Sequence, residues 1–472
     1  MNIAFILPPY ELMKKGYGSK KFIKAGFFPP LGVGYMAAPL LKKGHRVKII
    51  DCPPLQYQNE DVKKELLAFG VDIIGVSSLT ASAEEAYSLV RFVKINFPDV
   101  PIIFGGAHAS CFPELIIKEA PMVDCLCYGE GEETFVKIVD SYKQNGKIGL
   151  DIPGTWVRGA DGVFFKNPPA MPKMNLDEID FPAFELYDYN IYRPLPLQFK
   201  KNPVANIITS RGCPWGQCTF CFESGRASQK YRRHSPARVI EEIRTLVANF
   251  GVKEITFWDD NFLVNEAWVN EFCDLLDRAG FKIPWSACGR VNTVTQSMLA
   301  RAKKSGLWCV FYGFETGNED LLLRIKKGAT LDQARQAVKW TKDLEVDIRG
   351  SFMLALPGET PAKARKTIEF ACELDITFVQ FVLTFPEWGT ELYEDAVKSG
   401  RLVPSYQGRT AVSYIPQGYK DADEVRKMQQ EAYRSFYFRP AFIWQHFKRL
   451  MKDWRLIGQY FEGLKYILGV SQ

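Results

Sequence analysis

The sequence predicts an α/β protein in two successive units: a Rossmann-like, doubly wound parallel sheet and a partial (β/α)6 barrel, followed by a C-terminal helical tail. Short apolar runs alternate with helical periods over residues 1–140, and the alternation starts again at Val204. This pattern is typical of parallel sheets covered by helices. With 472 residues and 47% hydrophobic content, the chain is long and apolar enough for more than one core.

The first unit is expected over residues 1–145, with helices near 32–43, 82–97 and 131–144. Glycines follow its successive strands, at Gly75, Gly105-Gly106 and Gly129-Glu130-Gly131. One such glycine indicates only a turn, but their repeated placement favours a ligand at the carboxyl edge of the sheet. The predicted strands are Ile3–Leu7, Arg46–Asp51, Ile73–Ser77, Ile102–Phe104 and Cys125–Tyr128.

The second unit is expected over residues 201–385, after a linker over 146–200 that contains seven prolines. Ser235-Pro236 is expected to cap its first helix. Six βα repeats are too few for an eight-stranded barrel, so an open barrel is expected, with its site at the carboxyl ends of the strands. The predicted strands are Val204–Ser210, Glu254–Trp258, Pro284–Cys288, Cys309–Tyr312, Ile348–Leu354 and Phe378–Leu383.

The last region, residues 386–472, is expected to end in one amphipathic helix. Residues 432–472 hold seven Lys or Arg against two Asp or Glu, so the rest of the chain is nearly neutral and a nucleic-acid partner is not expected. The helix is expected to dock on the barrel, to contact an anionic membrane surface, or to line the entrance for a large apolar substrate. Its apolar stripe is Ile443, Phe447, Leu450, Trp454, Ile457, Phe461, Leu464 and Leu468, with Lys448, Arg449, Lys452 and Arg455 opposite.

Eleven cysteines and a short N-terminal strand, ended by Pro8-Pro9 instead of a signal segment, predict a reducing, cytoplasmic compartment. Cys213, Cys218 and Cys221 lie within nine residues on the loop after the strand that ends at Ser210, without a fourth cysteine at matching distance. A closed zinc site requires four protein ligands, whereas an iron–sulfur cube can leave one iron for a substrate or cofactor. The other cysteines are expected to be buried and inert: Cys52, Cys111, Cys125, Cys127, Cys273, Cys288, Cys309 and Cys372.

The cysteine motif and its βα context resemble the radical S-adenosylmethionine (SAM) enzymes over roughly residues 200–385. Cys218-Thr-Phe-Cys221 matches the second half of that family's motif, with Phe220 before the last cysteine, but four residues precede Cys218 where the family usually has three. The resemblance implies a [4Fe–4S] cluster whose open iron chelates SAM. It also implies that an electron donor such as a flavodoxin or ferredoxin supplies the electron that cleaves SAM to a 5′-deoxyadenosyl radical. A degenerate zinc site and free buried thiols are the alternatives.

Later segments also resemble SAM-binding parts of this family. Phe257–Phe262, with Asp259 and Asp260, resembles the segment that receives the SAM ammonium group, which a carboxylate can bind. The segments around Arg290 and Glu315 resemble those that hold the SAM carboxylate, ribose or methionyl group, and residues 352–360 resemble the adenine support. For each charged side chain taken alone, a helix cap or a surface salt bridge is an equal alternative.

The first unit resembles cobalamin-binding domains, and its segments at 29–34, 105–108 and 129–132 resemble the cobalamin-dependent branch of the radical SAM family. Leu31 stands where other cobalamin-binding members place a histidine below cobalt, so the resemblance implies cobalt without a protein ligand. His108 is expected to pack or hydrogen-bond near the cofactor, and His45 and His234 to be surface or capping residues. The implied cofactor contacts are Leu31, Ser77, Leu79, Gly105, Gly106, His108, Gly129 and Glu130.

These resemblances imply a cobalamin-dependent radical SAM C-methyltransferase that acts on an unactivated carbon. A cobalamin-dependent oxidative cyclase or rearrangement enzyme is the alternative within enzymes, and a cofactor-binding sensor without turnover is the alternative outside them. The aromatic tail favours a large apolar small-molecule substrate such as a lipid, isoprenoid or tetrapyrrole.

Overall fold

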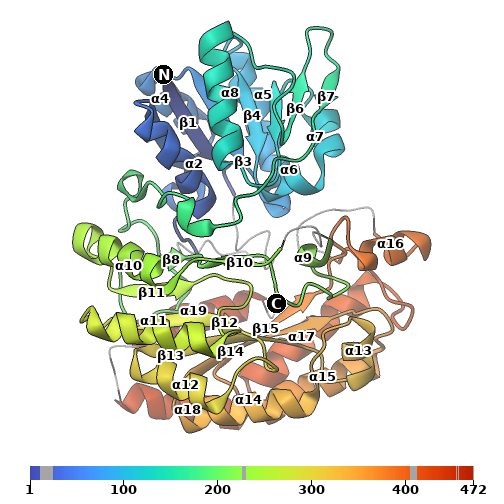
Figure 1. Cartoon of the computed structure of the whole chain (residues 1–472). Coiled ribbons are helices and arrows are strands. Elements are labelled where there is room, and N and C mark those ends of the chain that lie inside the picture. The colour runs from blue at the N-terminus through green and yellow to red at the C-terminus, as the bar shows by residue number, and fades with distance from the viewer. Residues whose placement is uncertain (11–24, 226–229, 404–411, 453, 455–456, 471–472) are drawn as a thin grey trace. The chain divides into compact units, whose positions relative to one another are not determined.

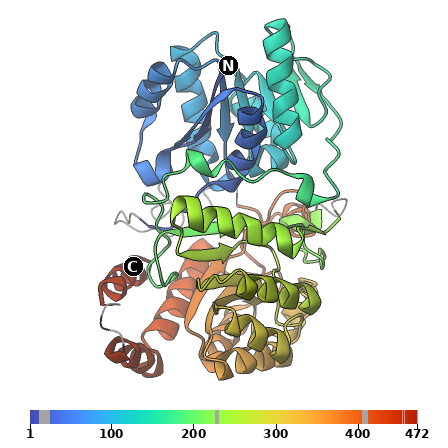
Figure 2. The same ribbon diagram turned by 60° about the vertical axis from the view of Figure 1, so that its left-hand side comes forward.

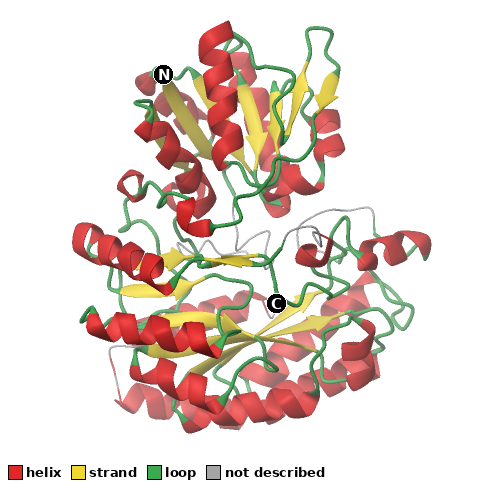
Figure 3. Cartoon of the chain, in the orientation of Figure 1, coloured by secondary structure: helices red, strands yellow, loops and turns green. Residues whose placement is uncertain are grey.

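The computed structural model describes residues 1–10, 25–225, 230–403, 412–452, 454 and 457–470. The chain divides into two compact units, Met1–Leu12 with Gly26–Tyr192 and Met13–Ala25 with Arg193–Gln472. Within each unit, strands form a central sheet and helices pack against it, as Figures 1 and 3 show. The predicted α/β class is confirmed.

The first sheet has the strand order β2-β1-β3-β4-β5-β6-β7. Strands β1 to β5 are parallel, and their bounds agree with the predicted strands to within one residue. The order 2-1-3-4-5 is that of flavodoxin-like sheets, in which ligands bind at the carboxyl edge where the winding direction changes. These strands are β1 (Asn2–Leu7), β2 (Arg46–Asp51), β3 (Ile73–Ser77), β4 (Ile102–Gly105) and β5 (Cys125–Cys127).

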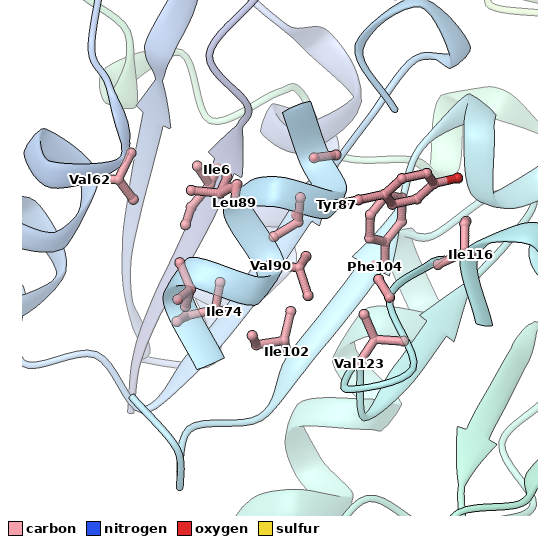
Figure 4. Close-up of a cluster of buried hydrophobic side chains, with 14 of the residues drawn as sticks. Ile6, Val62, Ile74, Tyr87, Leu89, Val90, Ile102, Phe104, Ile116 and Val123 are labelled. Atoms are coloured by element: carbon pink, nitrogen blue, oxygen red, sulfur yellow. The ribbon is translucent and has the colours of Figure 1, made fainter. Parts of the chain in front are cut away.

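Alternate residues of these strands are buried on opposite faces of the sheet, because successive side chains of a strand point in opposite directions. Ile6, Ile74 and Ile102 belong to one apolar cluster, drawn in Figure 4, in which Val62 and Val90 also lie. Their neighbours along the strands, such as Phe5 and Ile103, belong to a second cluster. The helices are α2 (Leu31–Lys42), α4 (Asn59–Phe69), α5 (Ala83–Asn96), α6 (Ala107–Cys111), α7 (Pro113–Glu119) and α8 (Glu132–Asn145).

The predicted linker over 146–200 contains regular structure that the sequence analysis did not anticipate. Strands β6 (Thr155–Arg158) and β7 (Phe164–Lys166) extend the first sheet beyond β5 in antiparallel fashion. Residues up to Tyr192 group with the first unit, so this stretch mainly completes that unit. Prolines surround these strands but do not interrupt their hydrogen-bonded ladder.

The second sheet has six parallel strands in the order β15-β14-β13-β12-β11-β8, and helices lie between them along the chain (Figure 2). The predicted partial barrel is confirmed, and Ser235 accepts a hydrogen bond from the Arg238 amide, as expected of a helix cap. The strands are β8 (Val204–Ile207), β11 (Glu254–Phe257), β12 (Trp285–Gly289), β13 (Leu307–Glu315), β14 (Asp347–Leu354) and β15 (Phe378–Leu383). The principal helices are α10 (Pro236–Phe250), α11 (Glu266–Arg278), α12 (Gln296–Lys304), α13 (Glu319–Arg324), α14 (Leu331–Asp343), α15 (Pro361–Leu374) and α16 (Glu391–Lys398).

The prediction of one long terminal helix is wrong. After α17 (Ala422–Tyr437), the chain forms two helices, α18 (Pro440–Lys452) and α19 (Ile457–Val470). Phe442 and His446 face inward on α18, whereas Ile443 and Phe447 of the predicted stripe are more than half exposed. Arg449, predicted on the basic side, is ion-paired with Asp347. Arg455 and the side chains of Lys452, Leu464 and Leu468 lie outside the described residues.

Within the described residues, no helix combines the length and apolarity needed to cross a membrane. The two histidines predicted to be surface or capping residues are not at the surface: His45 is 6% and His234 is 3% exposed. The main chain of His234 donates to the Thr209 carbonyl and accepts from the Trp268 ring nitrogen, so it joins the end of β8 to α11.

Candidate active site

The three cysteines of the motif lie on one loop that begins after β9 (Ser210–Arg211), beyond the carboxyl end of β8. Gly212 and Gly216 have positive φ of 82° and 56°, which lets the loop turn back sharply. The Cys221 amide donates to the Cys218 carbonyl at 3.1 Å. Cys218 is buried, and Cys213 and Cys221 are half-buried, so all three thiols are at least partly shielded from solvent.

Burial raises the pKa of Cys221 to about 12. Burial also raises the pKa of Cys218, and the nearby cations of Lys327 and Arg290 act against this effect. Within the described part of the chain, no three His, Cys, Asp or Glu side chains are arranged around a single metal ion. A cube binds each thiolate through a different iron, so three thiols on one turning loop, close to two cations, fit a cluster with one open iron.

Phe220, within this loop, and Arg290, outside it, connect the loop to the rest of the barrel. Phe220 is partly buried and packs on an apolar cluster that contains Leu321 and Met353, so it anchors the loop to α13 and β14. Arg290 follows β12 and is only 7% exposed. One of its terminal nitrogens lies 4.0 Å from the Cys218 sulfur. The sequence placed Arg290 at the mouth, and the structure brings it to the cysteine loop.

Glu315 forms a buried ion pair with Lys327, at 2.5 Å between Oε1 and Nζ. Glu315 has a positive φ of 64°, at a point where the register between β13 and β14 shifts. A side chain at Gly313 would meet both ionic groups, with Glu315 Oε1 at 2.5 Å from the position of its Cβ. A larger residue at position 313 would therefore displace the ionic groups of the pair. Sequence reasoning missed Lys327, because Lys326-Lys327-Gly328 after a short helix is typical of a solvated turn.

The two aspartates after β11 differ in environment. Asp259 is 2% exposed, and its carboxylate accepts hydrogen bonds from the Thr209 amide, the Thr209 hydroxyl and the Ser210 hydroxyl. It supports the end of β8, and the hydrogen bonds from Thr209 and Ser210 already occupy much of its accepting capacity. Asp260 is exposed and close enough to Cys221 to raise the pKa of that thiol.

The segment after β14 is held by a buried carboxyl group. Ala355 has a positive φ of 63°, and its amide donates to Glu359 Oε1 at 2.6 Å. The Tyr419 hydroxyl donates to the same oxygen at 2.7 Å. Burial raises the pKa of Glu359 to about 7. This network fixes the backbone of the segment predicted to support adenine.

In the first unit, the loops after β3 and β4 lie against each other. The Ser78 amide donates to the Gly105 carbonyl at 3.1 Å, and the His108 amide donates to the Ser78 carbonyl at 3.0 Å. Gly106 has φ of 89°, and a Cβ there would lie 2.6 Å from the Ser78 carbonyl oxygen. Ser77 is half-buried, and Leu79 is 64% exposed at this edge. The loops therefore form a closely packed support with an exposed apolar side chain.

His108 is buried, and both its ring nitrogens have partners. Nε2 lies 2.5 Å from the Tyr87 hydroxyl and Nδ1 lies 3.3 Å from the Thr80 hydroxyl. Burial lowers the pKa of His108 to about 4, so the ring is neutral at physiological pH. His108 thus has the hydrogen-bonding role expected from the sequence, without a free nitrogen for a metal.

The remaining predicted contacts lie at the neighbouring strand ends. Gly129 follows β5 with φ of 76°, is exposed, and donates its amide to Ser110 Oγ at 3.0 Å. Glu130 beside it is half-buried, and Leu31 begins α2 and is 5% exposed. An edge with open glycine backbone, apolar side chains and no free histidine fits a cobalamin whose cobalt takes no ligand from this unit.

Comparisons with known proteins agree with this description of both units. The chain matches a model of the B12 binding domain over residues 25–139 and a model of the Radical SAM superfamily over residues 207–371. A protein named as an uncharacterized methyltransferase of Pyrococcus horikoshii is 32% identical over 461 residues, which cover 94% of each chain.

Two further relatives have more specific names. The cytidylyl-2-hydroxyethylphosphonate methyltransferase of Streptomyces wedmorensis is 26% identical and aligns over 86% of each chain. The anaerobic magnesium-protoporphyrin IX monomethyl ester cyclase of Rubrivivax gelatinosus is 24% identical over 94% of this chain and 78% of its own. The fold resembles that of the radical S-adenosylmethionine methyltransferase TsrM of Kitasatospora setae, solved with cobalamin and a [4Fe-4S] cluster. The TM-score is 0.70 at 15% identity, with 93% of this chain and 89% of that chain covered.

Proposed function

Because the chain belongs to the family of radical SAM enzymes that carry a B12-binding domain, we propose that it transfers a methyl group to an unactivated carbon of a small-molecule substrate. The observation that carries this proposal is the pairing of a three-cysteine loop in one unit with a cobalamin-type sheet edge in the other. When bound, the cluster and SAM would supply a 5′-deoxyadenosyl radical, and cobalamin would supply the methyl group. A relative named as a specific methyltransferase supports transfer over cyclisation.

In this proposal, each side chain of the barrel mouth has a distinct task. Cys213, Cys218 and Cys221 hold the cluster, and Phe220 fixes their loop to the core. Asp260, exposed beside Cys221, receives the SAM ammonium group. The other polar groups at the mouth, Arg290 with the Lys327–Glu315 pair, face the polar part of SAM.

In the first unit, backbone and apolar side chains hold the cofactor. We assign corrin contacts to Leu31, Ser77, Leu79, Gly105, Gly106, Gly129 and Glu130, with His108 supporting the loop through its hydrogen bonds. Leu31 has no lone pair to donate, and the nitrogens of His108 are engaged. A cobalt without a protein ligand would gain and lose a methyl group readily, as methyl transfer requires.

The test is anaerobic reconstitution with iron, sulfide and cobalamin, followed by reduction in the presence of SAM. We expect 5′-deoxyadenosine to form, with dithionite or a flavodoxin or ferredoxin as electron donor. Cys218→Ala should abolish cluster absorption and SAM cleavage but retain cobalamin. Cys288→Ala, a thiol outside the loop, is the matched control and should behave as wild type. Full SAM cleavage by the Cys218→Ala protein would contradict the assignment.

A cyclase is the second candidate function, because one relative over 94% of this chain is named as a cyclase. Mass spectrometry of products distinguishes the two reactions. A methylated product together with S-adenosylhomocysteine supports methyl transfer, whereas an unmethylated, cyclised product supports the second candidate. Failure to form any 5′-deoxyadenosine, despite bound cluster and SAM, would leave a sensor role.

We further propose that the substrate is large and apolar and that the terminal helices contact an anionic membrane surface from which such a substrate comes. Seven large apolar side chains of this region are at least 46% exposed, and Lys448 lies over the Trp444 ring. The test is sedimentation with phosphatidylserine vesicles, with Phe447→Glu as the variant and exposed Met171→Glu as the control. Equal binding of both variants, or none by wild type, would contradict it. The seven residues are Ile443, Trp444, Phe447, Met451, Trp454, Ile457 and Phe461.

A further inference from the structure

The loop between Cys213 and Cys218 has one residue more than is usual in the radical SAM motif, and Trp215 lies in it. Trp215 is half-buried and hydrogen-bonded to another segment of the barrel. Its ring nitrogen donates to the Lys326 carbonyl at 2.9 Å, a residue 111 positions away. The longer loop thus makes a specific contact with the turn that follows α13.

That turn accepts hydrogen bonds at four successive carbonyls, all from the surroundings of the cysteine loop. Two donors belong to the loop itself, and two belong to the segment after β12. Four consecutive acceptors used in this way make the turn a rigid base for both segments. The pairs are Thr219 N with Ile325 O (3.1 Å), Trp215 Nε1 with Lys326 O (2.9 Å), Arg290 Nη2 with Lys327 O (2.5 Å) and Asn292 Nδ2 with Gly328 O (2.7 Å).

Gly328 provides the surface on which the Trp215 ring lies. A Cβ at this position would stand only 2.1 Å from Trp215 Cζ2, and the φ of Gly328 is 66°. Both the backbone conformation and the close approach require glycine here. The close packing of the Trp215 ring on Gly328 therefore depends on the residue types at both positions.

Trp215 also contacts Arg290. The guanidinium carbon lies 5.2 Å from the centre of the Trp215 ring, a cation–π geometry. The same guanidinium reaches the Cys218 sulfur at 4.0 Å and is almost fully buried. The position of this cation beside a cluster ligand thus depends on three contacts, with the Trp215 ring, the Lys327 carbonyl and Asn292 Oδ1.

We propose that Trp215 is a positioning residue that holds Arg290 against Cys218 and thereby keeps the reduction potential of the cluster high. The inference rests on the cluster assigned under the proposed function. A reduced cluster carries one more negative charge than an oxidised one, so a buried cation and an N–H donor at a ligand sulfur stabilise the reduced state. This assigns a task to one residue of the longer loop.

The test is potentiometric titration of the reconstituted full-length protein, with the reduced cluster followed by electron paramagnetic resonance. Trp215→Ala should shift the potential to more negative values and change the g-values of the reduced cluster. Trp215→Phe keeps a ring over Gly328 and beside Arg290, so it should retain most of the wild-type potential. Gly328→Ala should reproduce the shift of Trp215→Ala, because the new methyl group displaces the ring.

Gln217→Ala, in the same loop and exposed, is the control and should leave the potential unchanged. If Trp215→Ala takes up no iron, the reduction potentials of Gly328→Ala and Trp215→Phe are compared instead, and a more negative potential in Gly328→Ala supports the positioning role. Equal potentials and spectra for wild type and every cluster-containing variant would overturn the positioning role while leaving the cluster assignment intact. Absence of a cluster in wild type would instead overturn the proposed function.

Discussion

At the residue scale, the Lys327–Glu315 pair is the most demanding feature of the barrel mouth. Each side chain is only 9% exposed, so neither charge is stabilised by bulk water. We predict that Lys327→Met lowers the free energy of unfolding of the second unit by roughly 3–5 kcal/mol, because it leaves the Glu315 carboxylate buried and unpaired. Denaturant unfolding, followed by tryptophan fluorescence, measures the change.

The matched control is Lys339→Met. Lys339 and Asp343 also form an ion pair, but their side chains are 66% and 49% exposed. An exposed pair of this kind contributes about 0–1 kcal/mol. The double variant Lys327→Met with Glu315→Leu should recover most of the lost stability. Equal effects of Lys327→Met and Lys339→Met would show that burial does not govern the pair.

The sequence was enough to predict that polar residues after the strands lie at the barrel mouth. It was not enough to predict which residues they hydrogen-bond or pair with. Arg290 and Glu315 were found from the sequence because each follows an apolar run. Asp259 and Asp260 look equivalent in sequence, and only the fold shows that Thr209 and Ser210 engage the first. Hydrogen bonds between residues 50 positions apart leave no local signal in the sequence.

At the element scale, the contact between the loops after β3 and β4 yields a second prediction. Gly106→Ala places a methyl group 2.6 Å from a backbone oxygen of Ser78 at a φ of 89°, so the two loops must separate. We expect cobalamin affinity to fall at least about tenfold, or about 1.4 kcal/mol. Absorption titration with aquacobalamin measures it.

Gly44→Ala is the control for backbone strain alone. Gly44 has a φ of 77°, and nothing lies within 4 Å of its Cβ position. This variant should cost about 1–2 kcal/mol of stability without a change in cobalamin affinity. A tenfold loss in Gly44→Ala as well would indicate that general destabilisation, not the loop contact, explains the result.

Elements with strong apolar runs were predicted closely, whereas short polar ones were not. Strand β2 (Arg46–Asp51) was predicted to the residue, because its run is flanked by clear turn signals. Strand β7 (Phe164–Lys166) has three partly or fully exposed residues and forms only by pairing with β6. The break between α18 and α19 was also missed, since the apolar spacing continues through it.

At the scale of the whole molecule, buried carboxyl groups and buried histidines have opposite effects on how stability depends on pH. Burial raises the pKa of four carboxyl groups to about 7, so the folded chain retains protons there that the unfolded chain loses near pH 4. Their stabilising contribution is present at low pH and is lost as the pH rises through 7. Burial lowers the pKa of His108 and His446 to about 4, which favours folding as the pH rises to 6.5. The carboxyl groups are Asp51, Glu242, Glu254 and Glu359.

The difference in melting temperature between a variant and wild type isolates the effect of Glu359 from the effects of the other buried groups. In Glu359→Gln, the amide oxygen can accept from the Ala355 amide and the Tyr419 hydroxyl, while the NH₂ replaces the protonated oxygen. Between about pH 4.5 and about pH 7, the unfolded wild type has lost the Glu359 proton that the folded wild type still holds, and the variant has no such proton. We therefore expect the melting temperature of Glu359→Gln, relative to wild type, to rise between about pH 4.5 and about pH 7 and to level off above this range. Exposed Glu271→Gln should show no such trend, and an unchanged difference for Glu359→Gln over this range would mean that the folded protein keeps Glu359 ionised.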